Sequence, residues 1–326
     1  MGEMTTSEML QDIEIENFRG ISKLRLSFLG PDKKPSRIAV LAGPNGCGKT
    51  TVLEACLLAC GRANLLRGEH GPGAVRSGAA SYRIQATFQD GQTSRSVECG
   101  ARSASVPVEV SCDYFSSWRA PRLVGAVSVT AGKRGKRPGL TEENRLWTVK
   151  QRLVNAKAHE SMSSSSSLAG GSPYEEVLQR VRDIWDMFYP GKHESFSVEP
   201  VGTDPDEGFD VYLNTSEGGR IPLNSLSSGQ LELFLLAGSA IPYQPDASII
   251  CIDEPELHLD PQWHRLILRA MMKLRPNCQF IVGTHSPEVY DSVMSYERHF
   301  LVPDDDPRAR AWAEIGKEDP EACSRT

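Results

Sequence analysis

The sequence predicts an α/β fold with a mixed or parallel sheet, an antiparallel β-subdomain and a small helical insertion. One reason is the stretch GPNGCGKT at residues 43–50, which follows the apolar run RIAVLA and precedes the apolar run TTVLEACLLAC. This order of strand, glycine-rich loop and helix is typical of a phosphate-binding loop. The other reason is that strand and helix patterns alternate from residue 228 to residue 303, as they do in a parallel sheet covered by helices.

The composition is that of a globular chain. Its 326 residues are 39% hydrophobic, and the net charge of −6 argues against a surface that is coated by nucleic acid throughout. Eight cysteines are scattered without a C-x-x-C pair, which favours reduced thiols over a metal centre. The N-terminus has no signal-peptide pattern and no apolar run approaches about 18 residues, so we expect a cytoplasmic protein without a membrane partner.

Strand patterns dominate the N-terminal part of the chain. Alternating stretches at 9–16 and 23–29 predict two strands joined by the turn NFRGIS, and the apolar run at 37–42 predicts a buried strand. The almost uniformly apolar stretch at 50–60 predicts a helix buried between two layers. Three short alternating runs, separated by turn residues, predict an antiparallel meander over 81–116.

Two helical patterns follow. Leu146, Val149 and Leu153 have helical spacing within 141–158, and a capping box at Ser172 opens a second helix that begins with proline. The basic, glycine-rich stretch at 131–139 and the serine-rich stretch at 159–173 are expected to be flexible loops. These two helices are too short for a sustained coiled coil.

The C-terminal part predicts a hairpin and then the alternating elements of a parallel sheet. Helices are expected at 228–240, 260–274 and 286–294, and strands at 247–253, 278–285 and 299–303. We therefore expect four segments. They are an N-terminal lobe at 1–130, a helical insertion at 131–192, a C-terminal lobe at 193–305 and a charged tail at 306–326.

The phosphate-binding loop supplies the first candidate site residues. Gly43, Gly46 and Gly48 tolerate the backbone dihedrals that turn N–H groups toward a phosphate, and the helix N-terminus that follows favours a negative charge. Lys49 supplies a positive charge to the β- and γ-phosphates, and the Thr50 hydroxyl supplies a ligand to Mg²⁺. The residues expected to contact the nucleotide here are Asn45, Gly46, Cys47, Gly48, Lys49, Thr50 and Thr51.

A second motif, ASIICIDEP at residues 247–255, is an apolar strand that ends in two acids. Successive strand side chains point to opposite faces, so Asp253 and Glu254 are expected to have different roles. We assign Asp253, with Thr50, to the Mg²⁺ shell. We assign Glu254 to orienting or deprotonating the attacking water.

Two further motifs follow the same order along the chain. LSSGQ at 226–230 either caps the next helix through Ser227 or forms a second anion site from its hydroxyl and backbone N–H groups. The strand at 278–285 delivers His285 to its carboxyl end, where ligands bind in open α/β sheets. We therefore group His285 with Lys49 and Glu254 as candidate catalytic residues.

Together these motifs resemble those of the ABC-type ATPases. They correspond to a Walker A motif at 43–50, a signature motif at 226–230, a Walker B motif at 248–254, a D-loop at 257–261 and a switch histidine on the next strand. The resemblance implies a two-lobed head that binds ATP and Mg²⁺ between two copies. Each site would then pair the Walker motifs of one subunit with the signature motif of the other.

The resemblance also implies roles for individual residues. The signature motif would act on the γ-phosphate bound to the other copy, Asp260 would cross the interface, and His285 would sense the γ-phosphate. Ser228 stands where glycine is usual in this motif. The signature residues expected at the nucleotide are Ser227, Ser228, Gly229 and Gln230.

The branch of the family is indicated by other stretches. IEIENFRGISKLRLSF resembles the N-terminus of repair and recombination ATPases related to SMC and RecF proteins. DEPELHLDP and THSPEV are similar to overcoming-lysogenisation-defect and related AAA-type ATPases of phage defence. That likeness implies that Arg19 contacts the nucleotide. The chain departs from these relatives because it has no long coiled coil and no nuclease-like module after His285.

The glutamine that contacts Mg²⁺ in relatives has no single counterpart. Gln89, Gln92 and the segment DYFSSWRAP with Arg119 remain alternatives.

Two functions remain open from the sequence. The first is an ATPase that hydrolyses ATP to ADP and phosphate, forms a homodimer or a higher even oligomer around ATP, and controls a separate effector such as a nuclease. Anti-phage defence of the Septu or retron-associated kind is its expected setting. The alternative is a DNA-binding repair or recombination ATPase whose affinity falls steeply with salt. Its DNA-binding residues would be Lys133, Arg134, Lys136 and Arg137, with Arg119 and Arg122.

Overall fold

The computed structural model divides the chain into two compact units. The first comprises residues 1–117, 244–256 and 277–326, and the second comprises residues 118–243 and 257–276. The lobe boundaries expected from the sequence stay a prediction. The structure describes residues 9–66, 70–89, 94–99, 110–117, 123–129, 145–162, 173–204, 207–239 and 249–303.

An antiparallel sheet of four strands forms one layer of the first unit, in the order β2-β1-β4-β5. Leu10, Ile13 and Ile15 of β1 are buried, because the strand turns one face toward the core. The two strands predicted before residue 30 are confirmed. The strands of this sheet are β1 (Leu10–Phe18), β2 (Ile21–Ser27), β4 (Tyr82–Phe88) and β5 (Ser94–Cys99).

A five-stranded sheet forms the other layer, in the order β12-β3-β11-β10-β6, and all its neighbouring strands run parallel. Every residue of β3, β10 and β11 is buried, as expected for strands covered on both faces. The parallel sheet that the sequence predicted is thus confirmed. Its strands are β3 (Ile38–Ala42), β6 (Cys112–Phe115), β10 (Ile249–Asp253), β11 (Gln279–Thr284) and β12 (Arg298–Phe300).

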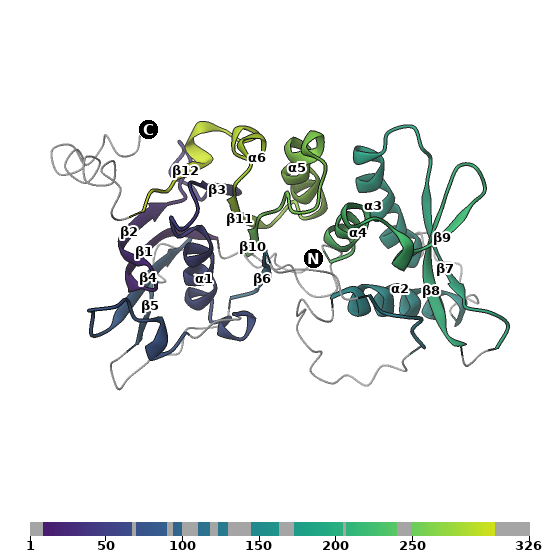
Figure 1. Cartoon of the computed structure of the whole chain (residues 1–326), viewed down its shortest axis with the longest axis horizontal. Coiled ribbons are helices and arrows are strands. Elements are labelled where there is room, and N and C mark those ends of the chain that lie inside the picture. The colour runs from purple at the N-terminus through teal and green to yellow at the C-terminus, as the bar shows by residue number, and fades with distance from the viewer. Residues whose placement is uncertain are drawn as a thin grey trace, which may run out of the picture. The chain divides into compact units, whose positions relative to one another are not determined.

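Helix α1 (Lys49–Ala59) lies between the two sheets (Figure 1). Its side chains share one hydrophobic core with residues from both layers. Val52, Leu53 and Leu57 are fully buried, and so are Cys56 and Cys60, which pack as small apolar side chains. The helix predicted to be buried between layers is therefore present, and its N-terminus lies at the carboxyl edge of the parallel sheet.

One buried side chain joins the two sheets. The Gln279 amide at the start of β11 accepts a hydrogen bond from the Leu10 backbone N–H at 2.8 Å and donates one to the Leu10 carbonyl at 2.8 Å. It also donates to the Ser36 carbonyl at 3.1 Å. These bonds satisfy polar groups that would otherwise be buried without partners.

The prediction that a third strand belongs to the antiparallel meander is wrong. β4 and β5 pair antiparallel as expected, but β6 pairs parallel with β10 and forms the edge of the other sheet. The reason is burial. Cys112, Tyr114 and Phe115 are all buried, and this mostly apolar strand is better covered in the parallel sheet than at the half-exposed end of a meander.

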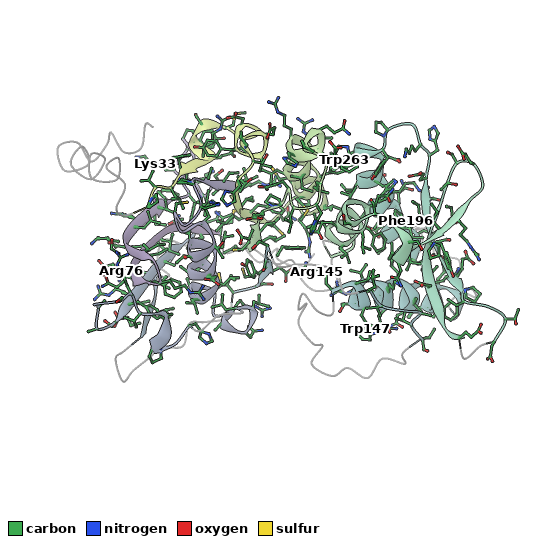
Figure 2. The ribbon with its side chains drawn as sticks, in the orientation of Figure 1. Lys33, Arg76, Arg145, Trp147, Phe196 and Trp263 are labelled. Atoms are coloured by element: carbon green, nitrogen blue, oxygen red, sulfur yellow. The ribbon has the colours of Figure 1, made fainter. Side chains whose placement is uncertain are left out.

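In the ranges that the structure describes, the second unit combines four α-helices with a three-stranded antiparallel sheet in the order β7-β8-β9. Its core is aromatic: the Phe196 ring (labelled in Figure 2) packs against two other aromatic rings. Its centroid lies 5.0 Å from that of Trp185 and 4.9 Å from that of Phe234. The elements are α2 (Arg145–Met162), α3 (Pro173–Phe188), α4 (Ser228–Ser239), α5 (His264–Leu274), β7 (Ser195–Pro200), β8 (Phe209–Asn214) and β9 (Arg220–Pro222).

A fully buried lysine links several elements of this unit. The Lys150 ammonium on α2 pairs with Asp210 Oδ1 on β8 at 2.7 Å. It also donates to the Val124 carbonyl at 2.7 Å and to Asn224 Oδ1 at 3.2 Å. Asn224 lies in the short helix η5 (Leu223–Ser225), which directly precedes the LSSGQ stretch. The buried charge therefore fixes the backbone that leads into this motif.

Several of the predicted loops and end segments lie partly or wholly outside the described residues. α2 continues to Met162, so the beginning of the expected loop at 159–173 is helical. The basic stretch at 131–139, the capping residue Ser172 and the charged tail at 306–326 lie outside the described residues. Within the described ranges, no helix has the length and apolar character that crossing a membrane requires.

The remaining helices are short. They are η1 (Ala63–Leu65), η2 (Pro72–Ala74), η6 (Pro261–Trp263), α6 (Pro287–Asp291) and η7 (Ser295–Glu297).

Candidate nucleotide-binding site

The loop between β3 and α1 has the conformation that glycine makes available. Gly46 and Gly48 have φ values of 79° and 98°, in the region that other residues rarely adopt. A Cβ atom at Gly43 would collide with the Leu301 carbonyl oxygen, so no side chain fits there. A Cβ atom at Gly46 would meet no described residue within 4 Å apart from its chain neighbours, and Asn45 beside it is exposed. The loop backbone is therefore accessible to a ligand at the point where the sequence predicts phosphate binding.

Lys49 lies across this loop. Its ammonium donates to the Gly43 carbonyl at 2.8 Å and to the Pro44 carbonyl at 3.1 Å, and lies 3.7 Å from the Cys47 thiol. The side chain is only 6% exposed, so the loop holds its positive charge in place. Such a charge beside backbone N–H groups suits phosphate oxygens. Thr51, on the first turn of α1, is partly exposed next to it.

The two expected metal ligands are in direct contact. The Thr50 hydroxyl donates to Asp253 Oδ2 at 2.8 Å, which joins the start of α1 to the end of β10. Asp253 is 2% exposed, and Thr50 is exposed. Hydroxyl and carboxylate oxygens are hard ligands of the kind that Mg²⁺ takes in nucleotide sites, where phosphates and waters supply the others. These residues therefore fit the ion.

Glu254 and His285 form a second pair at the same edge of the sheet. His285 Nε2 lies 3.7 Å from Glu254 Oε1, and the two side chains are 39% and 32% exposed. Glu254 has a φ of 52°, and its N–H donates to the Gly283 carbonyl at 2.7 Å. This left-handed backbone turns the chain at the end of β10, so the carboxylate of Glu254 leaves the sheet and meets the histidine. A carboxylate and an imidazole with solvent access can orient and deprotonate a water molecule.

The LSSGQ stretch forms a capping box in the second unit. Ser227 Oγ accepts from the Gln230 N–H at 3.3 Å, and Gln230 Oε1 accepts from the Ser227 N–H at 3.0 Å. The capping interpretation is thus confirmed, and the anion-site interpretation stays a prediction. Ser227 and Ser228 are both exposed at the start of α4.

Gly229 has a packing role that the sequence did not reveal. A Cβ atom at this position would lie 2.6 Å from the His258 carbonyl oxygen, and Gly229 is buried. His258 itself has a φ of 65°. The stretch that contains Asp260 therefore packs directly on the first turn of α4. Asp260 is exposed and caps η6 by accepting from the Gln262 N–H at 3.0 Å.

Comparisons with known proteins agree with this geometry. The profile of a family described as "AAA domain, putative AbiEii toxin, Type IV TA system" matches residues 151–291, and the profile of a family described as "AAA domain" matches residues 12–120. Two stretches of the chain thus match AAA-type domains.

Parts of this chain are also homologous to proteins of phage defence. The "Retron Ec83 probable ATPase" of Escherichia coli is 35% identical over 37% of this chain and 23% of its own length. The Septu protein PtuA of Bacillus thuringiensis is 31% identical over 30% of this chain and 28% of its own length. The segments that match this chain thus make up less than a third of each relative.

The fold is that of an SMC head. An Smc head solved with the C-terminal winged-helix domain of ScpA superposes with a TM-score of 0.56. It covers 90% of this chain and 97% of that one, at 15% identity. The expected α/β fold, with parallel and antiparallel sheets, is thereby confirmed.

Arg19 of the N-terminal ATPase domain has a partner within the chain. Its guanidinium forms an ion pair with Glu54 of α1 and lies 5.6 Å from the centre of the Phe18 ring. Burial raises the pKa of Glu54, and the Arg19 charge opposes this rise. The nucleotide contact expected of Arg19 stays a prediction.

A cavity of about 310 Å³ lies beside the phosphate-binding loop of this domain. Sequence reasoning missed one of its residues, Arg76, which is labelled in Figure 2. Its guanidinium donates to the Gly20 carbonyl. No motif rule covers an isolated arginine so far from the loop in sequence. The cavity is lined by Gly20, Ile21, Gly46, Cys47, Gly48, Arg76 and Pro303.

The structure describes part of two of the three alternatives for the residue that would take the place of the Mg²⁺-contacting glutamine. Gln89 follows β4 in the antiparallel sheet, and its N–H donates to the Met9 carbonyl. The DYFSSWRAP segment instead begins in β6, next to β10. Burial raises the pKa of Tyr114, and the nearby charge of Asp253 raises it further. The choice between Gln89, Gln92 and the DYFSSWRAP segment stays a prediction. Gln92, Arg119, Arg122 and the basic residues of 131–139 lie outside the described residues.

Proposed function

We propose that this chain hydrolyses ATP to ADP and phosphate with Mg²⁺ as cofactor. The observation that carries the proposal is the hydrogen bond between Thr50 and Asp253, because it joins the phosphate-binding loop to the acidic end of β10. Glu254 and His285 lie at the same edge of the parallel sheet. The residues proposed to bind phosphates and the pair proposed to activate water thus belong to the same unit.

Each side chain has a role in this reaction. Bound Mg²⁺ would neutralise charge on the β- and γ-phosphates, with Thr50 and Asp253 as its protein ligands. Lys49 would leave its loop carbonyls for phosphate oxygens, which are stronger acceptors. Glu254 would accept the proton of the attacking water, and His285 would contact the γ-phosphate beside it.

We propose further that ATP drives self-association of these heads into a dimer or a higher even oligomer. Ser227 accepts a hydrogen bond through Oγ, which leaves its hydroxyl hydrogen for a phosphate oxygen of a second copy. Exposed Asp260 would cross the same interface. The packing of Gly229 on the His258 carbonyl supports a shared surface, because it makes the two elements move together.

The biological setting follows from the relatives. Retron-associated and Septu proteins are homologous to parts of this chain, which supports a role in defence against phage. We propose that the ATP-dependent assembly controls a separate effector protein, for which a nuclease is the candidate class. An affinity purification of the chain expressed with its genomic neighbours tests this, and the absence of any bound protein in the presence of ATP would contradict it.

The variant Glu254→Gln tests the catalytic part. We expect it to bind ATP with unchanged affinity and to release phosphate at least about 100-fold more slowly, because the general base is lost. Glu217→Gln is the matched control, since Glu217 is exposed in a turn of the second unit. Phosphate release by Glu254→Gln at the wild-type rate would rule out this assignment of the base.

A further inference from the structure

We propose that Glu256 is a positioning residue that holds His285 in reach of Glu254. This inference rests on the proposed ATP hydrolysis. Glu256 lies just after the acidic pair at the end of β10, and it was not among the residues that the sequence singled out. Three consecutive residues at the end of β11 donate to its Oε1 atom. These donors are the Thr284 hydroxyl at 2.7 Å, the His285 N–H at 2.9 Å and the Ser286 N–H at 3.1 Å.

We call Glu256 and its three donors, on Thr284, His285 and Ser286, the clamp, because these bonds hold the loop that carries His285. The bonds involve a carboxylate, so each is stronger than a bond between neutral groups. Thr284 is fully buried and Ser286 nearly so, whereas the side chain of His285 is exposed between them. The clamp therefore fixes the backbone of an exposed catalytic candidate from both sides. Ser286 extends it, because its Oγ accepts from the Val289 N–H at 3.3 Å and caps α6.

The clamp also sets the separation of the catalytic pair. Glu254 and Glu256 are separated only by Pro255, which is buried and has a fixed φ. His285 is thus tied, through its own N–H, to a segment that carries Glu254. The distance of 3.7 Å between His285 Nε2 and Glu254 Oε1 is therefore set by a short chain of rigid links. Without the clamp, the histidine loop would sample other positions.

Glu256 is not placed to react itself. Its Oε1 atom already accepts three hydrogen bonds. Its Oε2 atom is buried and accepts no hydrogen bond from the described residues. Water must reach a base, and Glu254 is partly exposed. Glu256 thus acts through His285.

Amide hydrogen exchange tests the clamp without ATP. In the wild type, the amides of His285 and Ser286 should exchange slowly although the His285 side chain is exposed. Glu256→Ala removes the acceptor of the His285 N–H, and we expect this amide to exchange at least about tenfold faster. The Ser286 N–H keeps the Thr284 hydroxyl as a second acceptor at 3.0 Å, so its exchange should change less. Glu256→Gln keeps an oxygen acceptor without the charge and should give a smaller increase. Unchanged exchange in both variants would overturn the clamp.

A double-mutant cycle tests the functional consequence. We expect Glu256→Ala to lower kcat by about 10- to 100-fold, with KM for ATP changed less than about threefold. His285→Ala should lower kcat by a similar factor. In the double variant, the second substitution should cost less than about threefold, because both act through one group. Multiplicative losses would show that Glu256 acts independently of His285.

Glu288→Ala is the matched control. The Glu288 carboxylate accepts from the hydroxyl of Ser286, next to His285, at 2.9 Å. The His285 N–H donates to Glu256 instead. We expect its kcat to stay within about threefold of the wild type. If Glu256→Ala does not fold, the same cycle is run with Glu256→Gln. A wild-type chain without phosphate release would contradict the proposed function alone, whereas the exchange experiment decides the clamp.

Discussion

The candidate site depends on a small number of polar atoms whose positions are fixed by burial. Asp253 and Lys49 are almost completely buried, and each is held by a named partner: the Thr50 hydroxyl for Asp253 and two loop carbonyls for Lys49. Because buried polar groups keep their hydrogen bonds, removing a single hydrogen-bonding atom here should change activity or stability measurably.

Removing the Thr50 hydroxyl tests the metal assignment. We expect Thr50→Ala to raise the Mg²⁺ concentration for half-maximal phosphate release by about tenfold or more, because one oxygen ligand is lost. Thr50→Ser keeps the hydroxyl and should behave like the wild type. Identical Mg²⁺ titrations of Thr50→Ala and the wild type would contradict the assignment.

His299 gives a prediction about pH. Burial lowers its pKa from 6.5 to about 4, since its Nε2 atom is enclosed and the ring packs edge-on against Phe28. Below pH 6.5 the unfolded chain binds a proton that the folded chain excludes. The stabilisation is therefore present above pH 6.5 and is lost as the pH falls toward 4, by at most about 3 kcal/mol.

Urea unfolding at pH 7 and pH 4.5 measures this effect. The wild type should lose more free energy of unfolding over this interval than His299→Leu, in which the titrating group is absent. Equal losses in the two proteins would mean that His299 is not responsible.

At the scale of elements, the clearest relation is between α4 and the stretch before η6. The first turn of α4 approaches the His258 carbonyl so closely that a methyl group at Gly229 has no room. Two segments that are distant in sequence are therefore held in one arrangement within the second unit. Their exposed residues, Ser227 and Asp260, are the ones assigned to contacts with another copy.

Gly229→Ala tests this packing. We expect a loss of about 1–3 kcal/mol in the free energy of unfolding, because the added methyl group forces the backbone apart. Ser228→Ala, one residue earlier and exposed, should change stability by no more than about 0.5 kcal/mol. Chemical denaturation of both variants gives the comparison, and equal stabilities would argue against the close approach.

The elements also show what sequence patterns can predict. Apolar spacing and turn residues predict β1, β2, β3, α1 and the alternating elements after residue 228, because most of these stretches are almost uniformly apolar or alternate between apolar and polar residues. The partner of β6 could not be predicted in the same way. A short apolar run fits either sheet, and only the packing of α1 and β10 decides between them.

The residues of the candidate site also fall into those that local patterns predict and those that they do not. The motifs located Lys49, Thr50, Asp253, Glu254 and His285, because their chemistry is tied to fixed spacing. Glu256, Arg76 and the Arg19–Glu54 pair depend on contacts between distant segments, and no local pattern encodes them. The role of Gly229 is similar, since it depends on a carbonyl of another loop.

At the scale of the whole molecule, the chain has the fold of an Smc head, and parts of it are similar to retron and Septu proteins. The Smc head fold and the AAA-type domains are common to many proteins, so the fold alone does not determine the output. The two halves of the proposed site lie in different units of the chain: Lys49 and Glu254 belong to the first, and Ser227 and Asp260 belong to the second. A second copy that supplies the missing half is the central claim.

Sedimentation velocity of Glu254→Gln, with and without ATP and Mg²⁺, tests this claim most directly. Blocked hydrolysis should trap the assembled state, so we expect a monomer without nucleotide and a dimer or higher even oligomer with ATP. Adding Ser227→Ala to the same protein should shift it back toward the monomer, because a trans contact to the γ-phosphate is lost. A Glu254→Gln protein that binds ATP and Mg²⁺ but remains a monomer would contradict the account.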